Sequence, residues 1–172
     1  MKITMHALSV EVFADTLGNL SRILEKGLAH ATQRKFDPGV LLASRLAPDM
    51  YPLTRQVQIA CDIAKNSVAR LAAREPLRFE DNETSIEQLR ARIARTIDYI
   101  KSVPASALEG SETRDIKVPT GDARTLEFKG LDFLQYWVLP NVFFHVTTAY
   151  NILRHNGVQI GKRDFIGGGR EF

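Results

Sequence analysis

Cysteine is nearly absent from the 172-residue chain, which contains only Cys61. No disulfide can form within the chain, and no cysteine-rich zinc site is available. No apolar run approaches the roughly 20 residues that a membrane-spanning helix needs. The first residues also lack the apolar stretch and small-residue cleavage site of a secretory signal. We therefore expect a cytoplasmic protein that makes no membrane contact and owes its stability to packing.

A concentrated basic surface is also lacking, although the formal net charge is +3. Lysine and arginine are scattered from Lys2 to Arg170 and interleaved with acidic residues, and no basic stripe alternates with stacking aromatics. We expect no nucleic-acid partner. At this length one core is the simplest expectation, and a compact fold would bury roughly 70% of the unfolded surface. Residues 1–172 are therefore predicted to form a single domain.

Amphipathic segments make up most of the chain, because apolar residues recur at spacings of three and four. The first predicted helix covers residues 8–30. The second is expected to start at Asp49 as N-cap, with Pro52 in its first turn, and to end before the Glu75–Pro76 break. The first inward stripe contains Val10, Phe13, Leu17, Leu20 and Leu24; the second contains Val57, Cys61, Ala64, Val68 and Leu71.

Two further helices are predicted in the second half. Thr84 and Glu87 match a capping box, which predicts a third helix that ends before Pro104. The fourth covers residues 131–155, and Gly157 is a fitting C-terminal stop. Four helices of comparable length predict an all-α fold, a four-helix bundle whose inward stripes share one core.

A change of period interrupts the helical pattern between the third and fourth helices. Over residues 114–128 apolar side chains alternate, so Ile116 and Val118 would face Leu126 and Phe128 across a turn at residues 119–123. The sequence therefore predicts a small β-hairpin insert between these helices.

Histidines are few, and two of the four occupy inward stripes. His145 and His155 are ten residues apart on one helix and cannot share a metal ion. His6 and His145 both face the predicted core, and a carboxylate such as Asp49 or Asp62 could complete a site for zinc, nickel or iron. The alternative is that both imidazoles are partly buried and hydrogen-bonded to neighbours. Both interpretations remain open at this point.

Pro140 lies inside the fourth helix, where it cannot donate a hydrogen bond to the carbonyl of Tyr136. A kink or local opening is expected there. The alternative is that Pro140 only bends the helix around the core. If the helix opens, a polar pocket is expected, lined by Asn141, His145 and Thr148 with Trp137 or Phe144 as its wall.

Other reactive groups give weaker indications. Cys61 falls on the apolar face of the second helix, which predicts an inert buried thiol. The chain contains neither a glycine-rich phosphate-binding loop nor a serine hydrolase elbow. The residues by themselves therefore assign no reaction.

Two segments carry a family resemblance. Residues 140–157 resemble the last helix of the DinB/YfiT-like superfamily, and residues 48–62 give a second similarity, through Pro48–Leu53, Gln56–Val57 and Ala60–Asp62. Together they resemble an uncharacterised branch, the domain of unknown function 1993, over nearly the whole chain. The resemblance implies an up-down-down-up four-helix bundle that is often dimeric. In better-known relatives it implies a divalent metal held by three histidines for thiol-transfer chemistry.

The chain departs from that pattern at two of the three metal positions. Counted back from Gly157, one family histidine falls on His145 and its partner falls on Asn141, while Gln56 occupies the remaining position. An amide oxygen is a poor substitute for imidazole on a transition metal. The leading prediction is a homodimer that binds a small ligand through Gln56, Asn141 and His145, or a member that has lost its metal. The rival is a transferase or hydrolase that uses zinc or nickel at His145. A purely structural or interaction protein is the third possibility.

Overall fold

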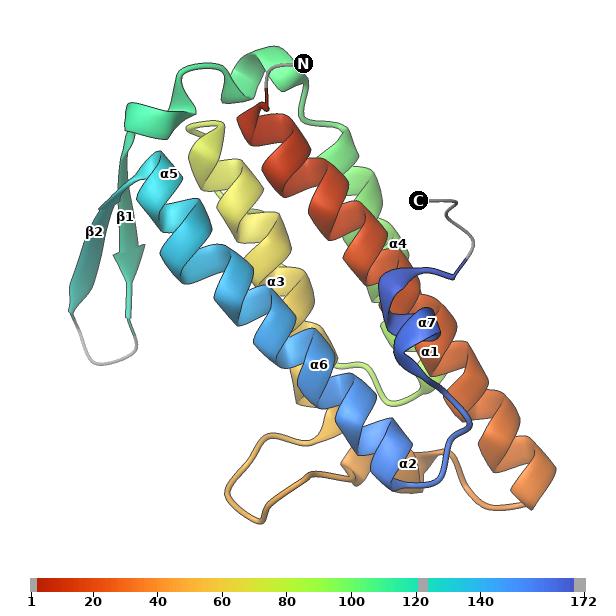
Figure 1. Cartoon of the computed structure of the whole chain (residues 1–172). Coiled ribbons are helices and arrows are strands. Elements are labelled where there is room, and N and C mark those ends of the chain that lie inside the picture. Colours follow the sequence, from red (N-terminus) through yellow and green to blue (C-terminus); the bar gives the residue numbers. More distant parts are fainter. Residues whose placement is uncertain (1–2, 121–123, 169–172) are drawn as a thin grey trace.

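Four long helices packed side by side dominate the computed structural model, which describes residues 3–120 and 124–168 (Figure 1). The long elements are η1 (Ala7–Glu11) continued by α1 (Val12–Arg34), α3 (Leu53–Leu71), α4 (Ile86–Lys101), and α5 (Gly130–Asp132), η4 (Phe133–Val138) and α6 (Leu139–His155) in succession. The short ones are α2 (Gly39–Ala43), η2 (Ala105–Leu108), η3 (Ser111–Thr113), β1 (Asp115–Pro119), β2 (Thr125–Lys129) and α7 (Lys162–Ile166). Within the described ranges, no helix combines the length and apolarity needed to cross a membrane.

The directions of the helices confirm the predicted up-down-down-up bundle. α1 and α6 run one way, whereas α3 and α4 run the other (Figure 1). α1 packs on α4, α4 on α3, and α3 on α6. Because α3 and α4 are consecutive and parallel, residues 72–85 must travel back along the bundle before α4 can start. We call residues 72–85 the return segment.

The predicted apolar stripes form the core. The side chains that were expected on the inward faces of the first two helices are all buried, and those of α4 and α6 close the core from the other sides. Burial of each large aliphatic side chain contributes about 1.5–3 kcal/mol to folding. Representative members are Phe13, Leu17, Val57, Val68, Leu89, Ile93, Val142 and Ile152.

Two predicted helix starts are wrong. α3 begins at Leu53, with Pro52 in extended conformation as its N-cap, and Asp49 does not cap it. Proline disfavours helical geometry in the residue before it, so the helix cannot begin earlier than Pro52. α4 is capped by Ser85, whose side chain accepts a hydrogen bond from the Gln88 backbone N–H, so the cap lies one residue after the predicted Thr84.

The fourth predicted helix is continuous but changes its winding before Pro140. It adopts π-helical geometry over Phe133–Val138 and then continues as α6. In a regular α-helix the ring of Pro140 would collide with the carbonyl of Tyr136, and the wider turn relieves this contact. The predicted disturbance is therefore a π-helical segment. The predicted stop is confirmed: Gly157 has φ +85°, and the Val158 N–H reaches the Leu153 carbonyl at 3.1 Å.

The predicted hairpin is present with the expected register. Ile116 pairs with Phe128 and Val118 pairs with Leu126. Residues 121–123 of the predicted turn lie outside the described part of the chain. The ring of Phe128 lies 5.8 Å from the rings of both Phe133 and Trp137, so the hairpin packs on the start of the fourth helix.

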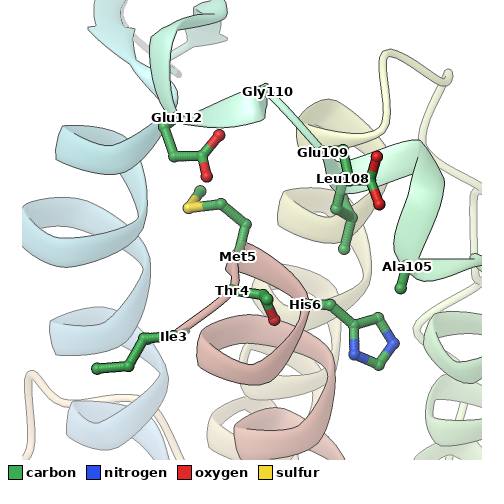
Figure 2. A pocket seen from close by; sticks show the side chains of 9 residues that line it. All are labelled: Ile3, Thr4, Met5, His6, Ala105, Leu108, Glu109, Gly110 and Glu112. Carbon is green, nitrogen blue, oxygen red and sulfur yellow. The ribbon is translucent and has the colours of Figure 1, made fainter. Parts of the chain in front are cut away.

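The two ends of the bundle are chemically different. At one end, the N-terminus of η1 lies beside η2 and the loop after it, around a cavity of about 300 Å³ (Figure 2). His6 lines this cavity. The opposite end holds the start of α3, because Arg114 donates a hydrogen bond to the carbonyl of Leu71 at the far end of that helix. His6 and the first turns of α3 are therefore at opposite ends.

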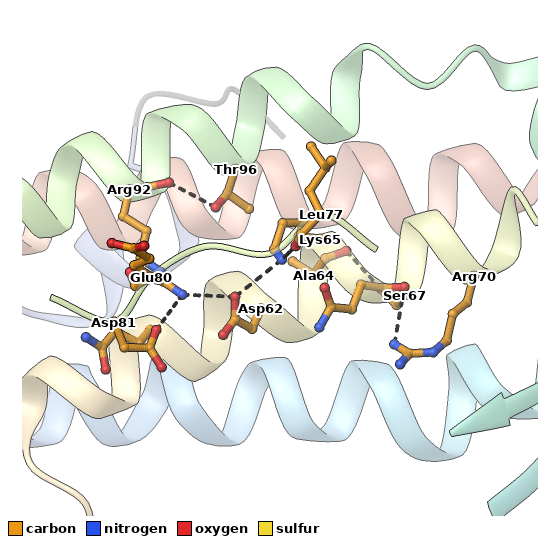
Figure 3. A network of polar contacts seen from close by, with 12 residues as sticks. Asp62, Ala64, Lys65, Ser67, Arg70, Leu77, Glu80, Asp81, Arg92 and Thr96 are labelled. Atoms are coloured by element: carbon orange, nitrogen blue, oxygen red, sulfur yellow. Dashed lines mark hydrogen bonds and ion pairs between the residues drawn. The ribbon is translucent and has the colours of Figure 1, made fainter. Parts of the chain in front are cut away.

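A buried arginine on α4 holds the return segment against α3 (Figure 3). Arg92 is 3% exposed. It contacts the carboxylates of Asp62, Asp81 and Glu83, each at 2.9 Å, and donates to the carbonyl of Glu80 at 2.9 Å. One cation thus joins α4, α3 and the return segment.

Phe79 anchors the middle of the return segment through contacts of its ring with Arg95, Lys65 and Arg92. The guanidinium of Arg95 lies 3.7 Å from the ring centroid, and the ammonium of Lys65 lies 4.6 Å from it. Lys65 is 2% exposed and donates to the Leu77 carbonyl. Burial lowers the pKa of Lys65, which Asp62 partly offsets. The segment is therefore fixed by charge and ring contacts although it has no helix or strand of its own.

Removal of the central cation tests this anchoring. We expect Arg92→Met to lower the free energy of unfolding by about 2–4 kcal/mol, because three carboxylates lose the Arg92 cation, although Asp62 keeps Lys65 and Asp81 keeps Arg55 as partners. Urea denaturation followed by circular dichroism measures the change. Arg34→Met, at an exposed position on α1, is the control and should change stability by less than about 0.5 kcal/mol. Equal effects of the two substitutions would refute the anchoring role.

The difference in stability between the wild type and Arg92→Met should depend on pH. Burial alone would raise the pKa of Glu83, but hydrogen bonds from Gln58 and Arg92 outweigh it and hold that pKa below its ordinary value of 4.5. A lowered carboxyl pKa stabilises the fold above the unfolded-state value, and this contribution disappears as pH falls through the folded-state value. The stability difference between wild type and Arg92→Met should therefore shrink below about pH 4.5.

Candidate functional site

A buried polar pair joins α6 to the start of α3. His145 Nδ1 lies 2.7 Å from Gln56 Oε1. Gln56 is 1% exposed and His145 is 9% exposed. The apolar stripe of each helix brings the pair together, because both residues occupy buried positions on α3 and α6, which pack on each other. Two of the three residues expected to converge therefore do so.

A backbone carbonyl fixes the orientation of Gln56 and, through it, the tautomer of His145. The Gln56 side-chain nitrogen donates to the carbonyl of Tyr51 at 3.0 Å. A carbonyl can only accept, so the amide oxygen must be the atom that faces His145. That oxygen also only accepts, so the proton of the neutral imidazole is on Nδ1. Nε2 is left with its lone pair.

The surroundings keep this imidazole neutral. Burial lowers the pKa of His145 below its ordinary value of 6.5, and the positive charge of Arg55 lowers it further. No described residue donates a hydrogen bond to Nε2, and this atom is not sealed from solvent. The edge of the Phe144 ring lies against the imidazole, with centroids 5.2 Å apart. His145 therefore offers one acceptor on a nearly buried side chain beside an aromatic ring.

The other predicted pocket residues satisfy their polar groups within the fourth helix. Asn141 Nδ2 donates to the carbonyl of Trp137 at 2.6 Å, and the Thr148 hydroxyl donates to the carbonyl of Phe144 at 2.7 Å. Trp137 lines a different cavity, beside the hairpin. Asn141 is thus hydrogen-bonded to its own helix, while Tyr51 and Arg55, which act on Gln56 and His145, were not predicted from the sequence.

Cys61 matches its predicted inert character. The thiol is fully buried, and burial raises its pKa to about 12 although Thr96 hydrogen-bonds to it. A thiol with such a pKa holds almost no thiolate near neutral pH. Cys61 is therefore a core residue.

Comparison with known proteins assigns the chain to a family. The model of the family described as domain of unknown function DUF1993 matches residues 5–166. The chain belongs to this family. A crystal structure of a DinB family member protein from Shewanella denitrificans is similar at 40% sequence identity and a TM-score of 0.90, over 98% of this chain and 94% of the other. Comparison with curated proteins gave no match. The DUF1993 chain thus has the DinB-like fold that its last helix indicated.

The donors around His145 do not fit the three-histidine metal site that the sequence resemblance implies. Gln56 turns its oxygen to His145 Nδ1, and Asn141 turns its amide to a backbone carbonyl, so one imidazole nitrogen is left as a donor to metal. His6 is hydrogen-bonded to Glu11 at 3.3 Å at the other end of the bundle. Asp62 is paired with Arg92. Within residues 3–120 and 124–168, no three His, Cys, Asp or Glu side chains converge as metal ligands.

The tautomer of His145 can be measured directly. We expect long-range ¹H–¹⁵N NMR spectra at pH 7 to show a protonated Nδ1 and an unprotonated Nε2, with protonation only below pH 6.5, the ordinary histidine value. Gln56→Glu should raise the pKa of His145, because a carboxylate stabilises the imidazolium. Gln56→Leu should cost about 1–3 kcal/mol of stability, because the buried Nδ1–H loses its acceptor. An Nε2-protonated ring in the wild type would contradict the geometry.

Proposed function

We propose that this DUF1993 protein binds a small molecule through His145, with Gln56 as the residue that sets the imidazole in place. The observation that supports the proposal is the buried hydrogen bond of 2.7 Å between His145 and Gln56. A buried polar pair costs desolvation energy that an aliphatic pair would avoid. Here that pair fixes one tautomer of one nearly buried histidine, which is the arrangement that recognition requires.

The chemistry of the pair restricts the ligand. A neutral imidazole with a free Nε2 accepts a hydrogen bond, so the ligand must present an N–H or O–H group. Phe144 is 56% exposed and Tyr51 is 58% exposed, which supplies an apolar surface beside the pair. We therefore expect a compact molecule with a hydroxyl or amide donor and an apolar body.

The rival function, a metal-dependent transferase or hydrolase, requires donors that are committed elsewhere. One imidazole supplies a single ligand, whereas catalytic zinc sites use three protein ligands. Tight binding of zinc or nickel at His145 is therefore not part of this proposal.

Ligand screening by NMR separates the two functions. We expect small alcohols and amides to shift the Hε1 signal of His145 and to leave that of the exposed His155 unchanged. His145→Ala should abolish binding, and His155→Ala is the matched control. Titration of zinc or nickel should show no stoichiometric binding at micromolar concentrations. Stoichiometric metal uptake that is lost in His145→Ala would support the rival.

A homodimer belongs to the same proposal. Two aromatic side chains on one stripe of the fourth helix are open to solvent, Tyr136 at 73% and Phe143 at 39%. Exposed aromatic residues that share a face are typical of association surfaces. We propose that a second copy of the chain covers this stripe.

Light scattering after size-exclusion chromatography tests the dimer. We expect the wild type to elute with the mass of two chains and the double variant Tyr136→Asp, Phe143→Asp to elute with the mass of one. Val40→Asp, at an apolar position on α2 that is 55% exposed, is the control and should remain dimeric. A monomeric wild type at roughly 50 μM would exclude a dimer of useful affinity.

A further inference from the structure

Besides the cavity lined by His6, another cavity lies where the hairpin meets the bundle, and His145 does not line it. It has a volume of about 200 Å³, is open to solvent and is lined by residues of α3, η4 and β1. Phe133 and Trp137 form its apolar side, together with Val118 of the hairpin. Trp137 and His145 are separated by eight residues, or about 12 Å along the helix axis. The cavity therefore differs from the site proposed above.

The polar side of the cavity is a row on α3. Asp62, Asn66 and Arg70 follow one another at intervals of one helical turn, and all three line the cavity. Figure 3 shows the side chains of Asp62 and Arg70 on α3, with Asp62 joined to Arg92 and Lys65. The cavity therefore has a polar wall, formed by a carboxylate, an amide and a guanidinium, and an apolar wall that contains two aromatic rings.

Arg70 is the cation of this row, and its donors are mostly unused. Its only hydrogen bond among the described residues is from Nη1 to the carbonyl of Asn66, at 3.5 Å. No described carboxylate lies within ion-pair distance of it, although Glu75 is close enough to influence it. Burial lowers the pKa of Arg70, so the guanidinium is partly desolvated without a paired anion. A guanidinium with free donors favours a planar carboxylate, which it binds through two parallel hydrogen bonds.

Asn66 supplies the complementary acceptor. Its Oδ1 is buried and has no hydrogen-bond partner within the described structure. An unsatisfied buried acceptor costs about 1–3 kcal/mol, so a donor at this place would be favourable. Arg70 Nη1 lies 3.5 Å from the backbone carbonyl of Asn66, and both residues line the same cavity. Asp62 adds a negative charge one turn away, although Arg92 and Lys65 already contact its Oδ1.

We propose that this cavity binds a small α-amino acid with an apolar side chain. The carboxylate of the ligand pairs with Arg70, and the ammonium group donates to Asn66 Oδ1. The side chain lies against Trp137 and Phe133. The carboxylate and ammonium groups of the ligand are carried by one carbon atom, and the two unused groups on α3 belong to residues one helical turn apart that line the same cavity. The volume holds about seven water molecules at roughly 30 Å³ each, which limits the ligand to a comparable number of heavy atoms.

Trp137 is the only tryptophan of the chain, so intrinsic fluorescence reports on this cavity alone. We expect L-leucine to change the emission of the full-length protein in a saturable way. L-Leucinamide lacks the carboxylate, and 4-methylpentanoate lacks the ammonium group. Each should bind at least tenfold more weakly than L-leucine. No saturable change with L-leucine up to roughly 10 mM overturns the proposal.

Variants locate the binding within the cavity. Arg70→Gln and Asn66→Leu should each weaken L-leucine binding at least tenfold, with folding verified by circular dichroism. Arg154→Gln, at an exposed arginine on α6, is the control and should bind as the wild type does. Equal binding by Arg70→Gln and Arg154→Gln overturns the proposal. If Arg70→Gln does not fold, the three probes on the wild type decide, because equal binding of L-leucine and L-leucinamide removes the role of the carboxylate.

The test is independent of the function proposed for His145. His145→Ala should retain L-leucine binding, because the imidazole lies about 12 Å farther along the helix. Loss of L-leucine binding in His145→Ala but not in Arg70→Gln would overturn the amino acid cavity and assign the ligand to His145.

Discussion

The parallel direction of α3 and α4 is the constraint from which much of the structure follows. Two consecutive parallel helices force the return segment along the bundle, and a segment without helix or strand cannot satisfy its own backbone. Arg92 solves this problem from α4: it donates to the Glu80 carbonyl and to three carboxylates. A buried cation is tolerated because each carboxylate offsets its desolvation. The network therefore fixes the chain direction rather than adding a reaction centre.

α4 and the return segment cover one side of α3, and α6 packs on another side. Gln58 faces the covered side and donates to Glu83 at 2.9 Å. Gln56 faces the other side and meets His145. α3 therefore carries ion pairs on one face and the buried Gln56–His145 hydrogen bond on the other. This division explains how one helix can bury several polar side chains without losing its place in the core.

Sequence periodicity predicted the bundle, the hairpin register and the stop at Gly157, because each depends on local patterns of apolar residues or glycine. Boundaries were harder. Residues 84–88 contain two overlapping capping frames, and only the three-dimensional fold selects Ser85.

Gln56 and His145 were found by matching a family pattern, which the sequence carries. The amide of Asn141 was not predictable, because its carbonyl partner on Trp137 appears only after the π-helical segment has formed. The Arg92 network joins residues up to 30 apart in sequence, so no local pattern reveals it.

The exchange of a metal donor for an amide changes what the bundle can recognise. An imidazole beside two others binds a cation through its lone pair, and the charge of the metal then attracts anions. Gln56 instead occupies the nitrogen that faces the core and leaves a neutral acceptor outward, beside the positive charge of Arg55. A neutral acceptor favours hydroxyl and amide donors over free carboxylates. Under the proposal made here, acid recognition comes from a cation elsewhere, and Arg70 on α3 is a partly buried cation with unused donors among the described residues.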